Sequence, residues 1–174
     1  MPRSPINTLP LLVVKSNRFM ARPKVYTSTG GHPGIDIWSP LGQDWTACVN
    51  GVLHIINKLK SQWGLGSGDP SYSRYGAAVA IDWGQGDGSF IRFVYGHGRN
   101  RKLGKDNQHI GEGDYVSESG NTGFSSGPHL HLEMRHYPRN GTGRYYDGLL
   151  RKRYNLQDPE KEFLIKYKIP YRLA

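Results

Sequence analysis

The sequence predicts an all-β fold, an antiparallel sandwich or barrel of short strands. Its composition favours strands and turns, because 23 of the 174 residues are Gly, 11 are Tyr, and long helix-forming stretches are absent. Apolar and β-branched runs of strand length recur along the chain, and Gly, Asp and Asn separate them. The segment GQGDG at 84–88 stands between two such runs, which indicates a hairpin loop.

Three regions follow one another along the chain: an N-terminal extension (1–24), a main domain (25–137) and a C-terminal extension (138–174). The N-terminal extension holds four prolines and one expected strand at 11–14. The C-terminal extension is basic and aromatic, and a short helix is expected there at 159–167.

The main domain is expected to consist of strands joined by turns, with one long interruption. A Gly- and Ser-rich stretch at 58–74 is either a groove-lining loop or a solvated hairpin loop. The expected strands of the domain are 34–38, 45–56, 76–83, 89–95, 114–117 and 129–135.

The charge and the cysteine content narrow the class of protein. A net charge of +9 at pH 7 predicts attraction to an anionic partner: nucleic acid, a cell-wall polymer or an acidic docking protein. Nucleic acid ranks lowest, because the basic cluster at 151–153 has no recognisable binding motif around it. A single cysteine, Cys48, excludes an internal disulfide. We find neither an export signal nor a segment long enough to span a membrane.

Three short motifs carry the chemistry: GHPGID at 31–36, YGH at 95–97 and GPHLH at 127–131. The Pro-Gly step in the first motif disfavours a helix, so His32 and Asp36 are expected at a turn that enters a strand, where they share one ion. Two imidazole nitrogens and one carboxylate bind zinc and leave one coordination position open, as in catalytic zinc sites. The pattern therefore predicts hydrolysis by a metal-activated water.

The third motif alternates polar and apolar residues. Side chains two residues apart on a strand point to the same face, so His129, His131 and Glu133 are expected on one face, and the apolar residues between them on the core side. One histidine is expected to bind the metal while the other stands beside the water.

The second motif adds His97, which follows an apolar run at 91–95. A neutral imidazole near pH 7 accepts or donates a proton, so we expect His97 and His129 to flank the attacking water and the scissile carbonyl. One helps to deprotonate the water, and the other stabilises the tetrahedral intermediate or protonates the leaving amine; the sequence leaves their assignment open. Three histidines outside the motifs are expected to be ordinary polar residues: His54, His109 and His136.

In these motifs the chain resembles the lysostaphin-type (LytM-like) zinc metallopeptidases, which cut peptide bonds in bacterial peptidoglycan. The family pattern is His-x-x-x-Asp, then Tyr-x-His, then His-x-His after Gly-Pro, and its most specific part here is GNTGFSSGPHLHLE at 120–133. The resemblance covers residues 25–137 and implies an antiparallel β-sandwich of the duplicated hybrid motif type, with a groove over one sheet. It implies that Zn2+ is bound by His32, Asp36 and His131, and that His97 and His129 are catalytic.

Two features depart from the family pattern. The family continues the central histidine with Leu-Ser, whereas Gly98 and Arg99 follow His97 here. The stretch 58–74 is also unusually long. Both departures are expected at the groove walls, where they would alter substrate preference.

Motifs and resemblance together predict a zinc metalloendopeptidase that hydrolyses bacterial peptidoglycan, in the stem peptide or the cross-bridge. Because no export signal is visible, we expect a bacteriophage protein for wall penetration or lysis, located in the virion tail or in the host cytoplasm before release. The C-terminal extension would then dock phage tail proteins. The alternative is a structural or docking module of a phage tail, in which the metal site only holds loops together.

Overall fold

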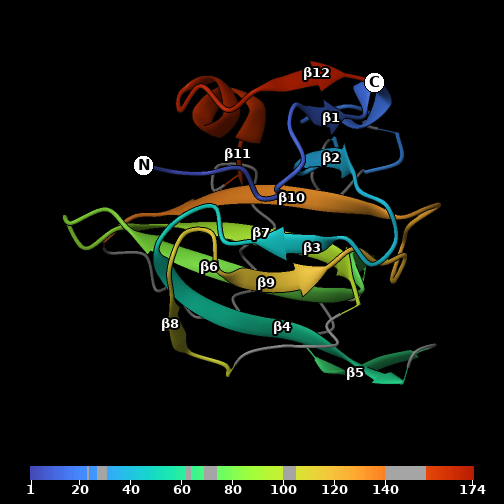
Figure 1. The fold of residues 1–174 in the computed structure, drawn as a ribbon, viewed down its shortest axis with the longest axis horizontal. Coiled ribbons are helices and arrows are strands. Elements are labelled where there is room, and N and C mark those ends of the chain that lie inside the picture. Colours follow the sequence, from blue (N-terminus) through green and yellow to red (C-terminus); the bar gives the residue numbers. More distant parts are fainter. Residues whose placement is uncertain (23, 27–30, 62–63, 69–73, 100–104, 140–155) are drawn as a thin grey trace.

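The computed structural model describes the chain except for residues 23, 27–30, 62–63, 69–73, 100–104 and 140–155. Its described residues form one large sheet, a small sheet over one face of it, and two short helices (Figure 1). The expected all-β class is confirmed. No helix of the described residues is long and apolar enough to cross a membrane.

The large sheet is antiparallel except at one edge. Its strands run in the order β12-β1-β2-β10-β7-β6-β4-β5, with β11 added to β10 and β8 added to β4, and β1 and β12 are parallel. The strands are β1 (Leu11–Val13), β2 (Ile35–Trp38), β4 (Gly51–Ser61), β5 (Gly64–Gly68), β6 (Ala77–Gly84), β7 (Phe90–Gly98), β8 (Gln108–Ile110), β10 (His129–Tyr137), β11 (Leu156–Gln157) and β12 (Tyr171–Leu173).

The small sheet pairs β3 (Asp44–Thr46) with β9 (Tyr115–Glu118) and covers one face of the large sheet. The core lies between the two sheets, because alternate residues of each strand point inward. On β10 this set is Leu130, Leu132 and Met134, all buried, as the alternation predicts. Trp45 of β3 is fully buried, and its ring lies 6.5 Å from that of Tyr95 on β7, between centroids.

The expected strand at 45–56 is wrong as one element. The chain changes sheets within it: β3 pairs with β9 in the small sheet, whereas β4 pairs with β6 in the large one. Between them, Ala47 donates a backbone hydrogen bond to Asp114 O and accepts one from Gly113 N, which fixes the turn. A continuous apolar run does not reveal such a change of partner.

The stretch at 58–74 is not only a loop. β4 continues to Ser61 and β5 occupies Gly64–Gly68 opposite it, so the described part is a β-hairpin at the sheet edge. The rest of the stretch, except Arg74, lies outside the described residues, and so does its expected groove-lining role. The hairpin loop at 84–88, between β6 and β7, is confirmed.

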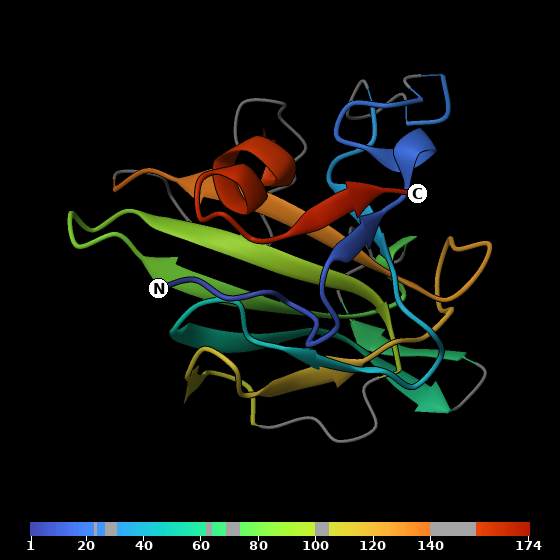
Figure 2. The same cartoon turned by 45° about the horizontal axis from the view of Figure 1, so that its top comes forward.

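Both terminal segments pair with the large sheet. The expected strand at 11–14 is β1, and β12 lies beside it (Figure 2). The helix expected at 159–167 is η5, a short π-helix over Glu160–Ile165. η1, one turn of 3-10 helix over Lys15–Asn17, follows β1. The division into two extensions and a domain stays a prediction.

A buried ion pair on the sheet face opposite the core yields a stability prediction. Arg92 on β7 is 1% exposed and donates two hydrogen bonds of 2.6 Å to Asp82 on β6. Burial alone would raise the pKa of Asp82, but the hydrogen bonds from Arg92 and His54 outweigh it, so this pKa lies below its usual value. The pair therefore stabilises the fold above the unfolded-state pKa of about 4, and that stabilisation is lost as the pH falls through the folded-state pKa.

We expect Asp82→Asn to lower the free energy of unfolding by about 3 kcal/mol at neutral pH, because it removes the negative charge that two hydrogen bonds hold against the buried Arg92 guanidinium. Urea unfolding near pH 7 and again near pH 2 measures this, with the exposed Asp44→Asn as control. The difference from wild type should shrink at the acid pH, because the wild-type carboxylate loses its charge as the pH falls through its lowered pKa. An equal loss at both pH values would contradict the assignment.

Candidate metal and catalytic site

The first motif lies where the chain enters β2. Gly34 packs so closely under β10 that a Cβ there would lie 2.2 Å from Leu132 O, so only glycine fits. His32 stands before this contact, and its Nδ1 lies 2.9 Å from Gly34 O. Nδ1 therefore carries the proton, and Nε2 presents a lone pair toward Asp36 on β2.

The third motif lies on β10, beside β2. In this antiparallel pair His131 is opposite Asp36, and His129 is opposite Trp38. Residues directly opposite one another extend on the same side of a sheet, so the register brings the two motifs together. On the other side of β10, Gly96 is opposite His131; a Cβ there would lie 3.4 Å from the His131 Cβ, so a side chain would crowd the imidazole.

His32, Asp36 and His131 form one buried cluster, whose candidate ligand atoms all lie within 4.8 Å of one another. Asp36 Oδ1 is 3.3 Å from His32 Nε2 and 3.0 Å from His131 Nδ1. Since His32 Nε2 presents a lone pair, it and the Asp36 oxygen are both acceptors, and at this distance they repel unless a cation stands between them. Two imidazoles and one carboxylate suit zinc, so the residues present fit such an ion.

His97 and His129 stand beside the cluster. Their ring centroids are 4.7 Å apart, and the His97 ring is 5.8 Å from that of His131. Each has its Nδ1 against a backbone carbonyl: His97 at 2.7 Å from Thr122 O and His129 at 2.8 Å from Gly127 O. Nδ1 of each ring therefore donates, and Nε2 carries the lone pair; that of His129 lies 3.4 Å from Asp36 Oδ1.

The electrostatics differ from one group to the next. Burial, with His131 and His129 nearby, lowers the pKa of His97 to about 3, so this imidazole is neutral at pH 7. Burial alone would raise the pKa of Asp36, but the close contacts with His129, His131 and His32 hold it far below its usual range. His97 also has a φ of 66°, a strained conformation that non-glycine residues adopt rarely and that recurs at functional sites.

A polar layer lies behind the cluster. Glu133 is fully buried, accepts hydrogen bonds from Tyr75 Oη and Arg135 Nε, and has Oε2 at 3.6 Å from His131 Nε2. Burial opposes ionisation of Glu133, but the charge of Arg135 and the contact with His131 lower its pKa to about 2. Glu133 is thus a buried anion beside His131, on the side of β10 that the alternation predicts.

Sequence reasoning missed three side chains at this site. The Tyr26 ring stands 5.0 Å from the His32 ring, and the Tyr75 ring 5.2 Å from the His131 ring, between centroids. Asn17 Nδ2 donates a 2.6 Å hydrogen bond to Asp36 Oδ2. None of the three belongs to one of the motifs, and no local sequence pattern indicates that it contacts the site. His54, by contrast, lies on Asp82, as an ordinary polar residue would.

Comparison with known proteins identifies a family. The profile of peptidase family M23 matches residues 30–147. Among curated protein sequences, none matches this chain. One similar solved structure is the catalytic domain of the prophage-encoded M23 protein EnpA from Enterococcus faecalis, in a mutant form; it is 23% identical, with a TM-score of 0.58, over 90% of this chain and 95% of that one.

Two further solved structures have the same fold. LytU is 23% identical, with a TM-score of 0.58, and the match covers 92% of this chain and 88% of that one. The catalytic domain of the antimicrobial peptidase lysostaphin from Staphylococcus simulans is 20% identical, with a TM-score of 0.50, over 93% of this chain and 88% of that one.

Proposed function

This chain belongs to peptidase family M23 and is a metalloendopeptidase, and we propose that it hydrolyses peptide bonds of bacterial peptidoglycan at the site built from His32, Asp36 and His131. We assign zinc to these three residues. A zinc ion held there supplies positive charge that polarises a scissile carbonyl and acidifies a water.

The observation that carries the proposal is the pair His97 and His129 beside the three-residue cluster. A structural zinc site is closed by four protein ligands and has no use for two further histidines, whereas a catalytic site keeps one position open. Both imidazoles have their Nδ1 proton held by a backbone carbonyl, so Nε2 of each is fixed as the atom that accepts or returns a proton. We assign the catalytic roles to this pair.

The surface around the pair and the overall charge support a wall substrate. Three apolar side chains are more than half exposed: Trp38 at the end of β2 (53%), Leu41 just after β2 (58%) and Phe124 in the segment before β10 (62%). A net charge of +9 attracts the protein to an anionic wall. The likeness to a prophage-encoded protein supports a phage origin, with the protein carried in a virion tail or released at lysis.

Purified peptidoglycan tests the proposal. Zinc-loaded wild type and His129→Ala are incubated with walls from several bacterial types, and turbidity and product masses are followed. New amino termini with wild type alone are expected, and their masses identify the bond that is cut. Intact walls in the presence of zinc-bound protein would favour the tail-module alternative. Detection of the protein in purified virions tests the phage assignment separately.

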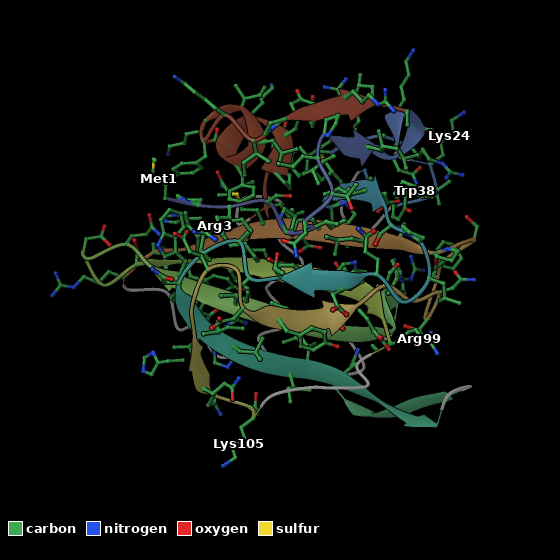
Figure 3. All side chains as sticks on the ribbon, viewed as in Figure 1. Met1, Arg3, Lys24, Trp38, Arg99 and Lys105 are labelled. Atoms are coloured by element: carbon green, nitrogen blue, oxygen red, sulfur yellow. The ribbon has the colours of Figure 1, made fainter. Side chains whose placement is uncertain are left out.

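Trp38 offers a prediction on substrate contact. It lies at the end of β2 (Figure 3), opposite His129 in the register, and therefore extends on the catalytic side of the sheet. Aromatic side chains that desolvate against a partner contribute about 2 kcal/mol or more, so Trp38→Ala is expected to lower kcat/KM roughly 30-fold. Leu173→Ala, with a side chain of similar exposure on β12, is the control. An unchanged kcat/KM for Trp38→Ala would exclude the contact.

A further inference from the structure

The two carboxylate oxygens of Asp36 have different partners. Oδ1 faces His32 and His131, at 3.3 Å and 3.0 Å from their ring nitrogens. Oδ2 accepts a 2.6 Å hydrogen bond from Asn17 Nδ2 on η1. We propose that Asn17 is a positioning residue for the metal site, which holds Oδ2 and thereby reserves Oδ1 for the ion. This rests on the proposed assignment of zinc to Asp36.

The orientation of the Asn17 amide is fixed from both ends. A carboxylate only accepts hydrogen bonds and a guanidinium only donates them. Asp36 Oδ2 therefore selects the NH2 group of the amide, and Arg22 Nη1, at 3.3 Å, selects its oxygen. The amide has one arrangement that satisfies both neighbours, and that arrangement points a donor at Asp36.

The backbone around η1 is attached to the metal motif itself. Val14 N donates to Asp36 O at 2.8 Å, and Asn17 N donates to Val14 O at 3.0 Å. The helical turn that carries Asn17 therefore starts at a residue bonded to the main chain of Asp36. Further along, Met20 N donates to His32 O and His32 N donates to Ala21 O. The segment 14–21 thus holds the main chain of two candidate ligands, and Asn17 adds the side-chain contact.

The C-terminal segment braces this arrangement. Arg18, next to Asn17, donates two hydrogen bonds of 2.7 Å to Glu160 of η5, whose side chain is 6% exposed. Tyr171 Oη donates to the same carboxylate at 2.7 Å. β12 runs beside β1 (Figure 2), and Lys15 N donates to Ala174 O at 3.1 Å. Residues 160–174 therefore fix η1 from the side opposite the metal motif.

The hydrogen bond from Asn17 to Asp36 Oδ2 is expected to control how the carboxylate binds the ion. Without the donor from Asn17, the Asp36 carboxylate would no longer be held with Oδ1 toward the ion, and Oδ2 would be free to compete for the position that a catalytic zinc site keeps open. Groups that orient a metal ligand from behind change metal affinity or activity by roughly 10- to 100-fold when removed. Removal of the Asn17 side chain is therefore expected to change zinc affinity directly, and turnover only as a consequence.

Metal titration tests the inference without substrate. Zinc affinity is measured on metal-free protein by chelator competition, and Co2+ serves as a spectroscopic probe of the ligand set. Asn17→Ala is expected to weaken zinc binding roughly 10- to 100-fold and to alter the visible spectrum of the Co2+ form. Asn17→Ser, which keeps a donor, should recover part of the affinity. The control is Lys15→Ala on the same helical turn, an exposed residue, with wild-type affinity and spectrum.

A double-mutant cycle tests the brace. Arg18→Gln is expected to weaken zinc binding less than Asn17→Ala, and to cost nothing further in the Asn17→Ala background, because it acts through Asn17. Additive losses would overturn the brace. Thermal unfolding of each metal-free variant separates a local effect from a loss of fold.

Failure of the inference and failure of the proposed function give different results. Wild-type zinc affinity and an unchanged Co2+ spectrum in both Asn17 variants would overturn the positioning role, even if wild type degrades peptidoglycan. Weakened binding in Asn17→Ala would support the role, even if no wall were cleaved. A wild-type protein that binds neither ion would overturn the inference together with the zinc assignment.

Discussion

His97→Ala and His129→Ala are each expected to lower kcat by about 10²- to 10⁴-fold while most zinc binding is kept, because each removes a group that moves protons and spares the three assigned ligands. Burial lowers the pKa of His97 to about 3, so its imidazole is neutral at pH 7 and free to take up a proton in the proposed reaction. Its Nδ1 is held by Thr122 O and that of His129 by Gly127 O, so Nε2 of each ring is the nitrogen that remains for the proposed proton transfers.

Parallel measurements of zinc content and kcat decide the assignment. His131→Ala is expected to lose both zinc and turnover, because it removes a ligand atom 3.0 Å from Asp36 Oδ1. His109→Ala, an exposed histidine on β8, is the control and should match wild type in both. Equal loss of zinc in the His97, His129 and His131 variants would contradict the separation of ligands from proton carriers.

The fold class, the core-facing side of β10 and the turn before β2 follow from strong local signals. Alternation over residues 129–134 predicts which side of β10 faces the core, and the buried Leu130 and Leu132 agree. A glycine between His32 and Asp36 predicts a turn, and the close contact of Gly34 with Leu132 O shows why no other residue fits. These signals are readable because they act between neighbours in the sequence.

The frame around the site has no such local signal. Asn17 meets Asp36 only because β1 pairs with β2 in the register Val13 to Ile37, a contact between segments that share no motif. Tyr26 and Tyr75 reach the histidines from outside the strands that carry the motifs. Register across such distances depends on the whole core, and composition does not encode it.

The terminal segments show the same difficulty. β11 and β12 have two and three residues, too short for an alternating pattern to stand out. β12 pairs in parallel with β1 and so brings a C-terminal strand beside an N-terminal one. The free edge of β1 with which β12 pairs exists only once the sheet has assembled. From its basic and aromatic composition, the C-terminal segment is therefore expected to be an extension. In the structure, its described last residues lie against the large sheet.

Removal of zinc is expected to abolish turnover and to destabilise the fold. A ligand that binds only the folded state adds about 4 kcal/mol at a free concentration 1,000 times its dissociation constant. For a chain of this size that corresponds to a rise in Tm of about 10 °C. Calorimetry of metal-free protein, with and without added zinc, measures the shift, and an assay after chelation and after zinc is restored measures turnover.

The rise in Tm caused by zinc distinguishes residues that bind the metal from those that do not, and it needs no substrate. His32→Ala and Asp36→Ala are expected to lose most of it, because each removes one of the three atoms that converge on the ion. His97→Ala should keep the shift, since the Nδ1 of this histidine is bound to Thr122 O and its proposed role is in proton transfer, not in metal binding. A full shift in Asp36→Ala would move the ion away from this cluster. A shift lost equally in His97→Ala would instead make that histidine a fourth ligand and the site a closed, structural one, so a single calorimetric series distinguishes the peptidase from the tail-module alternative.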